Sequence, residues 1–157
     1  MKRLEMPETL LGDLAEVGLG DHWYTGATEI PDQKGAYALL IGLEKPVVPQ
    51  RPVGNTERLG PGWYIYLGSA RGTGGLAGRL KRHFIKRKKV KWHVDQLTPR
   101  ASAIAAHVII DGDECDLMAR LAASYAFDIA MPGFGSSDCP ICPSHLIVWR
   151  APEQRPC

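Results

Sequence analysis

Two tyrosines, one arginine and one glutamate have the chemical types needed to hydrolyse a phosphodiester bond. Tyr37 and Tyr66 lie in apolar segments that predict strands, Arg79 lies in a segment that predicts a helix, and Glu114 begins a later helix. A guanidinium stabilises the charge that develops on a phosphoryl group. A carboxylate can hold Mg²⁺ or Mn²⁺, and a positioned phenol can take a proton from water. Each side chain also has an ordinary structural interpretation, as a packed strand tyrosine, a solvated arginine or a stabiliser of a helix start.

Two histidines add candidates for acid–base chemistry. His83 follows Arg79 by one helical turn, so we expect it to face the same phosphate; the alternative is a residue of the helix's basic face. If the segment KWHVD is extended, His93 and Asp95 lie on one side, and the carboxylate would orient the imidazole. The alternative there is a structural Trp92 beside a hydrogen-bonded histidine.

The segment RGTGGL, residues 71–76, joins the strand of Tyr66 to the helix of Arg79. Glycines at a helix start leave backbone N–H groups that can bind a phosphate. The segment lacks the Lys-Ser/Thr pair of a P-loop, which argues against a nucleotide site. We therefore expect these N–H groups to face a DNA phosphate.

Four cysteines are present in a chain that needs no disulfide to fold, so metal binding or buried thiols are the better interpretations. Cys139, Cys142 and His145 have the spacing C-x2-C-x2-H, in which the first pair has the spacing of zinc ligands. A fourth ligand would be Cys115 or Cys157. The alternative is a tight loop set by glycine and proline, in which the cysteines are small buried residues.

The 157 residues have a formal net charge of only +2, but the charge is unevenly distributed. Residues 79–91 contain eight Lys and Arg and no acidic residue, a pattern expected of a protein that binds polyanions. The alternative is a solvated helix face. The cations and the histidine that we expect to bind nucleic acid are Arg71, Lys81, Arg82, Lys86, Arg87, Lys88, Lys89, Lys91 and His93. Charge alone does not distinguish DNA from RNA.

The elements that must position these groups follow from hydrophobic patterning. The predicted helices cover 7–18 (with an acidic outer face), 74–87 and 111–126, and the predicted strands cover 33–44, 63–69, 101–111 and 145–150. Leu76, Leu80 and Phe84 should face the core from one helix, and Leu117, Leu121 and Tyr125 from the next. If the first two strands pair antiparallel, Tyr37 and Tyr66 can share a face.

The fold class is therefore α/β (α+β), a small mixed or antiparallel sheet of three to four strands flanked by helices. The length predicts one domain over 1–157, with the core at 33–130 and a Cys/His loop and last strand at 131–150. The sequence contains no signal-peptide pattern and no apolar run long enough to span a membrane. We expect a cytoplasmic protein with no membrane partner; protein partners are not predicted.

The order of these motifs resembles the GIY-YIG nuclease superfamily. The resemblance rests on GAY (35–37), YLG (66–68), the arginine of the helix ending RLKRH (79–83) and the later helical Glu114. The phrases GWYIYLGSA, KWHVDQL, FGSSDC and SHL look more specifically like a domain of unknown function, found alone or fused to endonuclease III-type repair enzymes.

The resemblance implies a DNA endonuclease that uses one Mg²⁺ or Mn²⁺, with a role in repair. It implies that Tyr37 and Tyr66 position or deprotonate the water, that Arg79 stabilises the phosphate, and that Glu114 holds the metal. The alternative is a non-catalytic nucleic-acid-binding module that keeps the fold and the basic helix. A structural protein that uses the basic run only for solubility is the least favoured interpretation.

Overall fold

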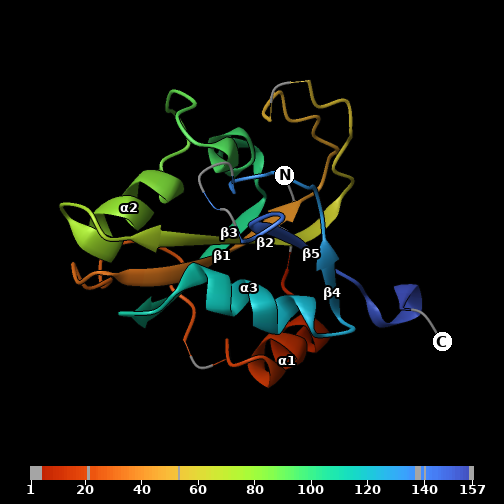
Figure 1. The fold of residues 1–157 in the computed structure, drawn as a ribbon, viewed down its shortest axis with the longest axis horizontal. Coiled ribbons are helices and arrows are strands. Elements are labelled where there is room, and N and C mark those ends of the chain that lie inside the picture. The colour runs from red at the N-terminus through yellow and green to blue at the C-terminus, as the bar shows by residue number, and fades with distance from the viewer. Residues whose placement is uncertain (1–4, 21, 53, 137–138, 140, 156–157) are drawn as a thin grey trace.

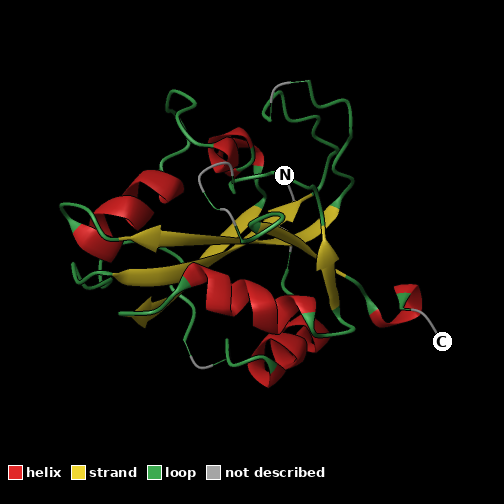
Figure 2. Cartoon of the chain, in the orientation of Figure 1, coloured by secondary structure: helices red, strands yellow, loops and turns green. Residues whose placement is uncertain are grey.

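A five-stranded antiparallel sheet forms the centre of the protein and has helices on both faces (Figures 1 and 2). The computed structural model describes residues 5–20, 22–52, 54–136, 139 and 141–155. The strands are β1 (Gly35–Leu43), β2 (Gly62–Ala70), β3 (Ala103–Ile110), β4 (Phe127–Ile129) and β5 (Leu146–Trp149), in the spatial order β3-β1-β2-β5-β4. The predicted fold class is confirmed, and the sheet has one strand more than expected because the three-residue β4 pairs with β5.

The helices form two layers on opposite sides of the sheet. They are α1 (Glu8–Glu16), α2 (Gly75–Phe84) and α3 (Glu114–Ala122), with 3-10 helices η1 (His93–Gln96), η2 (Thr98–Arg100) and η3 (Pro152–Gln154). Figure 1 shows α1 and α3 below the sheet, and α2 with the green chain that follows it above. In the part of the chain that the structure describes, no helix is long and apolar enough to span a membrane.

Both faces of β1 and β2 are buried because helices cover each side. Ala36, Ala38 and Leu40 pack in the cluster beneath the sheet, which includes the apolar faces of α1 and α3. Tyr37 and Tyr66 pack in the opposite cluster, with the apolar residues of α2. The two strands pair antiparallel, so the expectation that Tyr37 and Tyr66 share a face is confirmed.

The glycine-rich segment before α2 serves packing and does not form a phosphate cradle. Gly75 has φ +57°, and a Cβ there would lie 2.1 Å from the carbonyl oxygen of Asp32. The backbone N–H groups of Leu76 and Ala77 donate to the carbonyls of Gln33 and Pro31. The expected free N–H groups are therefore already used to join α2 to the chain before β1.

Several element ends differ from the prediction. The helix predicted over 111–126 ends at Ala122, so Tyr125 lies in a turn and is 83 % exposed instead of facing the core. Phe84, at the last position of α2, is only half-buried, whereas Leu76 and Leu80 are fully buried as predicted. The apolar pattern continues beyond these helix ends, but the helical conformation of the backbone does not.

Candidate active site

The four residues proposed for phosphodiester chemistry line one cavity. Its volume is about 320 Å³, and its lining residues are Tyr37, Tyr66, Gly68, Ser69, Arg79, Trp92, Glu114, Gly135, Cys139 and His145. The start of β1 and the ends of β2 and β3 lie at the same end of the sheet, because Gly35 pairs with both Ala70 and Ile110. The chain then enters α2 after β2 and α3 after β3, so both helices contribute to the cavity.

Two glycines make room for the two tyrosines. Gly68 lies opposite Tyr37 in the β1–β2 ladder, and a Cβ on Gly68 would lie 2.4 Å from the hydroxyl oxygen of Tyr37. Gly135, with φ +70°, would place a Cβ 2.6 Å from the ring of Tyr66. The glycine of YLG is therefore required because the ring of Tyr37 lies against the neighbouring strand.

Tyr37 is held in place by a hydrogen bond to His83. Its hydroxyl is 2.6 Å from Nε2 of His83, and neither side chain is more than 1 % exposed. Nδ1 of His83 is buried and has no hydrogen-bond partner among the described residues. Burial, together with the positive charge of Lys88, lowers the pKa of His83 to about 3, so the imidazole is neutral at pH 7. The expectation that His83 faces the phosphate is not met, because its ring packs against Tyr37, is fully buried and does not line the cavity.

Both phenols of the cavity are protonated at neutral pH. Burial raises the pKa of Tyr66 to about 12, and the charge of Arg79 opposes this effect. Burial also raises the pKa of Tyr37 well above its ordinary value, as does the neighbouring Tyr66. Each therefore offers a hydroxyl group that can donate or accept a hydrogen bond, rather than a preformed phenolate.

Trp92 holds Arg79 at the cavity wall. The guanidinium carbon of Arg79 lies 4.2 Å from the centroid of the indole ring, and Arg82 and Lys91 contact the same ring at 4.8 and 5.0 Å. Stacking on an aromatic face orients a guanidinium without using its N–H donors, which remain available to an anion. The sequence predicted only a structural anchor at Trp92, because nothing in the spacing of Arg79 and Trp92 indicates that they stack.

The buried carboxylate of Asp95 organises the chain around Trp92. It accepts hydrogen bonds from the backbone N–H groups of Lys91 and Trp92 and from Arg82, and Lys88 lies 3.7 Å away. Burial raises the pKa of Asp95, but these hydrogen-bond donors and the charge of Arg82 outweigh it and hold the pKa below its ordinary value.

The expected pair of Asp95 and His93 does not form, because the segment is the 3-10 helix η1 rather than extended chain. Nδ1 of His93 instead accepts from the N–H of Gly135 at 2.8 Å. This bond joins η1 to the segment that packs against Tyr66.

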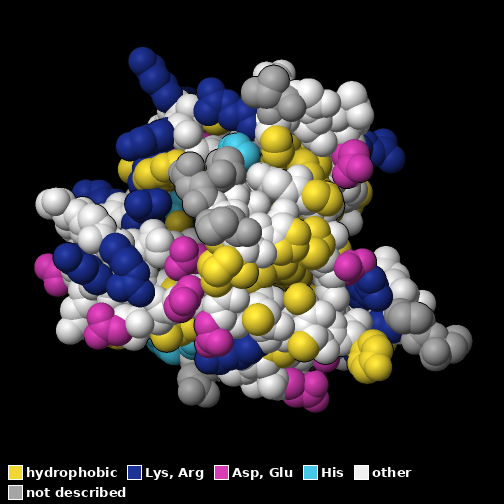
Figure 3. All heavy atoms as spheres, viewed as in Figure 1, with side chains coloured by type: hydrophobic (Ala, Val, Ile, Leu, Met, Phe, Trp, Pro, Cys, Tyr) yellow, Lys and Arg dark blue, Asp and Glu magenta, His cyan; other side chains and the backbone are white. Residues whose placement is uncertain are grey.

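The predicted nucleic-acid-binding cations divide into two groups. Arg82, Lys86 and Lys88 donate to backbone carbonyls of the protein itself, as does Arg71 to Gly112. The other group, Lys81, Arg87, Lys89 and Lys91, is exposed, and these side chains make no hydrogen bond or ion pair with the described residues. Figure 3 shows Lys and Arg gathered over α2 and the chain that follows it, while acidic side chains gather near the start of α3.

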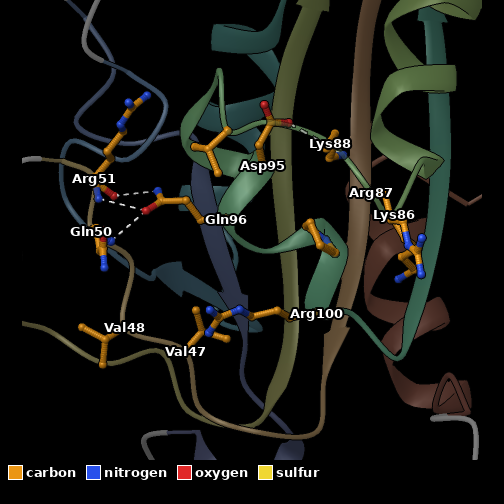
Figure 4. A pocket seen from close by; sticks show the side chains of 12 residues that line it. Val47, Val48, Gln50, Arg51, Lys86, Arg87, Lys88, Asp95, Gln96 and Arg100 are labelled. Carbon is orange, nitrogen blue, oxygen red and sulfur yellow. Dashed lines mark hydrogen bonds and ion pairs between the residues drawn. The ribbon is translucent and has the colours of Figure 1, made fainter.

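A second cavity, of about 500 Å³, lies beside this basic segment (Figure 4). Lys86, Arg87 and Lys88 line it from one side, and Arg51 and Arg100 line it from the loop before β2 and from η2. Gln96 accepts from the backbone N–H groups of Gln50 and Arg51, which fixes that loop. Sequence reasoning missed Arg51 and Arg100 because only the fold brings these isolated cations next to the basic run.

The predicted Cys/His group comes together in space. Cys115, Cys139, Cys142 and His145 each offer a ligand atom, and these four atoms lie within 4.8 Å of one another. Cys115 is the first-turn residue of α3 that follows Glu114, and it joins the group from across the fold. Cys157, the other predicted fourth ligand, lies outside the described residues.

Glu114 gives the cavity a donor that fits a divalent cation. Within the described part of the chain, it is the one carboxylate that lines the cavity, where it is half-buried. Mg²⁺ commonly keeps several waters and binds through one or two carboxylates together with substrate phosphate oxygens. One half-buried carboxylate in the same polar cavity as Arg79 therefore suits Mg²⁺ or Mn²⁺.

Together, the fold and the cavity define a small α/β domain with a polar, partly cationic cleft at one end of an antiparallel sheet. Residues 36–156 match the family described as domain of unknown function DUF123, and the chain belongs to this family. All the cavity residues fall within the matched region. No curated protein and no solved structure matches the chain.

Proposed function

We propose that this protein is a metal-dependent endonuclease that hydrolyses phosphodiester bonds in DNA, with a role in DNA repair. The observation that supports the proposal is that Tyr37, Tyr66, Arg79 and Glu114, from four different elements, line one cavity. The resemblance of the same residues to the GIY-YIG nuclease pattern supports it independently.

In the proposed reaction, a water oxygen attacks phosphorus and one phosphorus–oxygen bond to a sugar breaks. The products are a phosphate monoester and a hydroxyl group. Tyr37 and Tyr66 orient the water through their hydroxyl groups, and His83 fixes the position of the Tyr37 hydroxyl. Arg79 donates to the non-bridging oxygens as their negative charge increases.

Glu114 would hold one Mg²⁺ or Mn²⁺. When bound, the cation would withdraw electron density from the phosphate oxygens and offset their negative charge. Both tyrosines are neutral at pH 7, so charge stabilisation by Arg79 and the cation is the larger contribution that we expect.

DNA reaches the cavity along the exposed cations. Lys81, Arg87, Lys89 and Lys91 are free to contact phosphates, and Arg51 and Arg100 extend the cationic surface around the second cavity. Such contacts position a nucleic acid without reading its sequence.

The test is incubation with linear, nicked and branched DNA in the presence of Mg²⁺ or Mn²⁺. We expect cleavage that EDTA abolishes and that Arg79→Ala reduces by about 10²-fold or more. Glu114→Gln should abolish metal-dependent cleavage and leave DNA binding intact. The matched controls are Arg120→Ala and Glu16→Gln, two exposed residues beneath the sheet, which should retain full activity.

Two results would contradict the proposal. Salt-sensitive binding without cleavage of any substrate would instead support the non-catalytic nucleic-acid-binding module. Absence of both cleavage and salt-sensitive binding would exclude both nucleic-acid functions. Cleavage of RNA in preference to DNA would keep the chemistry and change the substrate.

A further inference from the structure

The cluster of Cys115, Cys139, Cys142 and His145, hereafter the Cys/His cluster, has the geometry of a closed metal site. The four ligand atoms lie within 4.8 Å of one another, and the sulfur atoms of Cys115 and Cys139 are 3.5 Å apart. Sulfur atoms around one tetrahedral zinc, with zinc–sulfur bonds of about 2.3 Å, lie roughly 3.8 Å apart. The four side chains are thus close enough together for one ion to contact all of them.

The backbone supports this arrangement. The N–H of Cys142 donates to Sγ of Cys139 at 3.3 Å, which turns the loop so that both sulfur atoms face the same point. Such amide donors also offset the negative charge of a metal-bound thiolate. The cysteines of the cluster form no disulfide in the described structure.

His145 provides a second and independent observation. Its side chain is only 6 % exposed, and its Nε2 is buried with no hydrogen-bond partner among the described residues. A buried polar atom without a partner is costly, and a metal ion would remove that cost. Because His145 belongs to the group whose ligand atoms lie within 4.8 Å, the ion would sit beside the three sulfur atoms.

We propose that the Cys/His cluster binds one structural Zn²⁺. Three thiolates and one imidazole favour zinc over Mg²⁺ or Mn²⁺, which prefer oxygen ligands. Four protein ligands close the coordination sphere, so the ion stabilises structure and does not itself take part in catalysis.

The zinc would join the first turn of α3 to the segment between β4 and β5. Glu114 directly precedes Cys115, and Cys139 and His145 line the same cavity as Glu114. The ion would therefore hold Glu114 in place in the cavity that Arg79 also lines. The binding of zinc is independent of the proposed nuclease function, whereas this positioning of Glu114 rests on it.

The first experiment measures the metal content of the purified full chain, prepared anaerobically, by elemental analysis and thiol titration. We expect one equivalent of zinc per chain and three cysteine thiols, those of the Cys/His cluster, that react only after the metal is removed. Zinc at trace level, or a disulfide between Cys115 and Cys139, would overturn the proposal. Neither result depends on nuclease activity.

The second experiment identifies the ligands by replacing zinc with Co²⁺, whose visible spectrum reports tetrahedral thiolate coordination. Cys115→Ser should weaken Co²⁺ binding severely, and the matched Cys157→Ser should leave it unchanged. His145→Cys should keep tetrahedral binding and increase the thiolate-to-cobalt absorption. The assignment would be overturned if Cys157→Ser weakened Co²⁺ binding and Cys115→Ser did not. An unchanged spectrum in His145→Cys would also overturn it.

The third measurement separates the positioning of Glu114 from the nuclease proposal. If wild-type protein cleaves DNA, the folded Cys115→Ser variant should lose cleavage but retain DNA binding, and Cys157→Ser should retain both. Retention of full cleavage by zinc-free Cys115→Ser would exclude the positioning role. If wild-type protein contains zinc but cleaves nothing, the nuclease proposal fails and the zinc site stands.

Discussion

The orientation of the side chains in the cavity depends on neighbouring residues, one of which is a glycine. Tyr37 can lie across β2 only because Gly68 leaves the space that its ring occupies. His83 then fixes the hydroxyl group of Tyr37 by a hydrogen bond, and Trp92 fixes the guanidinium of Arg79 by stacking. The proposed catalytic groups are thus oriented by contacts that exist before any substrate binds.

Gly68→Ala should displace the ring of Tyr37 and break its bond to His83. We expect a loss of about 1–3 kcal/mol in the free energy of unfolding, because overpacking forces neighbouring side chains from their positions. Cleavage should fall with it. Chemical denaturation measures the stability. Gly78→Ala is the control, because a Cβ there would contact only the backbone carbonyl oxygen of Thr73, at 3.9 Å. Equal stability of Gly68→Ala and wild type would contradict this account of the motif.

His83 should make the protein sensitive to acid. Its pKa is about 3 when folded and about 6.5 when unfolded, so between these values the unfolded chain binds the extra proton. Stability should therefore fall as the pH falls from about 6.5 towards 3, by up to about 1.4 kcal/mol per pH unit from this residue. The groups near its ring are Tyr37 from β1, Tyr66 from β2, Trp92, Lys88 and Asp95 from the segment after α2, and Arg79 and Arg82 from α2 itself.

Unfolding measured across this pH range in His83→Gln should show a shallower dependence than in wild type. His22→Gln, which changes an exposed histidine, is the matched control for loss of an imidazole. Parallel curves for His83→Gln and wild type would show that His83 is not held in the neutral form.

At the scale of elements, the segment from Lys86 to Gln96 is held in place by one buried carboxylate. Asp95 bonds the backbone of Lys91 and Trp92 and the side chain of Arg82, which itself reaches from α2. The segment is highly charged and has few apolar residues, so burial alone does not explain its conformation. Its ion pairs position Trp92, and through it Arg79.

Asp95→Asn should therefore destabilise the protein by about 3 kcal/mol, because it leaves the almost fully buried side chain of Lys88 without its counter-charge. Arg79 should also become less ordered, lowering cleavage. The control is Asp116→Asn, whose exposed pair with Arg120 contributes about 0.5 kcal/mol or less. Thermal or chemical unfolding distinguishes the two, and similar losses for both variants would be inconsistent with an organising role for Asp95.

Across the whole molecule, alternation and helical periodicity were enough to predict the sheet, its covering helices and the shared face of Tyr37 and Tyr66. The same patterns were not enough for β4, because three residues are too few to establish a period. Helical spacing placed His83 near Arg79, but the rotation of α2 against the sheet, which turns His83 inward, depends on packing. The sequence could not decide whether Cys115 or Cys157 is the fourth ligand, because 24 residues separate Cys115 from Cys139 and only the fold brings them together.

The surface charge should make DNA binding strongly dependent on salt. For duplex DNA, the logarithm of the binding constant falls with the logarithm of salt concentration by about 0.9 for each phosphate neutralised. Lys89→Gln, at an exposed position, should reduce this slope, whereas Lys88→Gln should mainly reduce stability because Lys88 pairs with Asp95. Binding titrations at several salt concentrations measure both slopes. If Lys88→Gln reduced the slope and Lys89→Gln did not, Lys88 rather than Lys89 would be the residue that contacts DNA.

The stacking of Arg79 on Trp92 also gives the protein an optical signal of its own. Trp63 and Trp149 are buried beneath the sheet and Trp23 is bonded to Leu19, so among the described tryptophans only Trp92 borders the cleft. An anion that draws the guanidinium away from the indole changes the electric field at the ring, and with it the fluorescence emission. A phosphate-bearing oligonucleotide should therefore shift the emission of wild-type protein and leave that of Trp92→Phe unchanged.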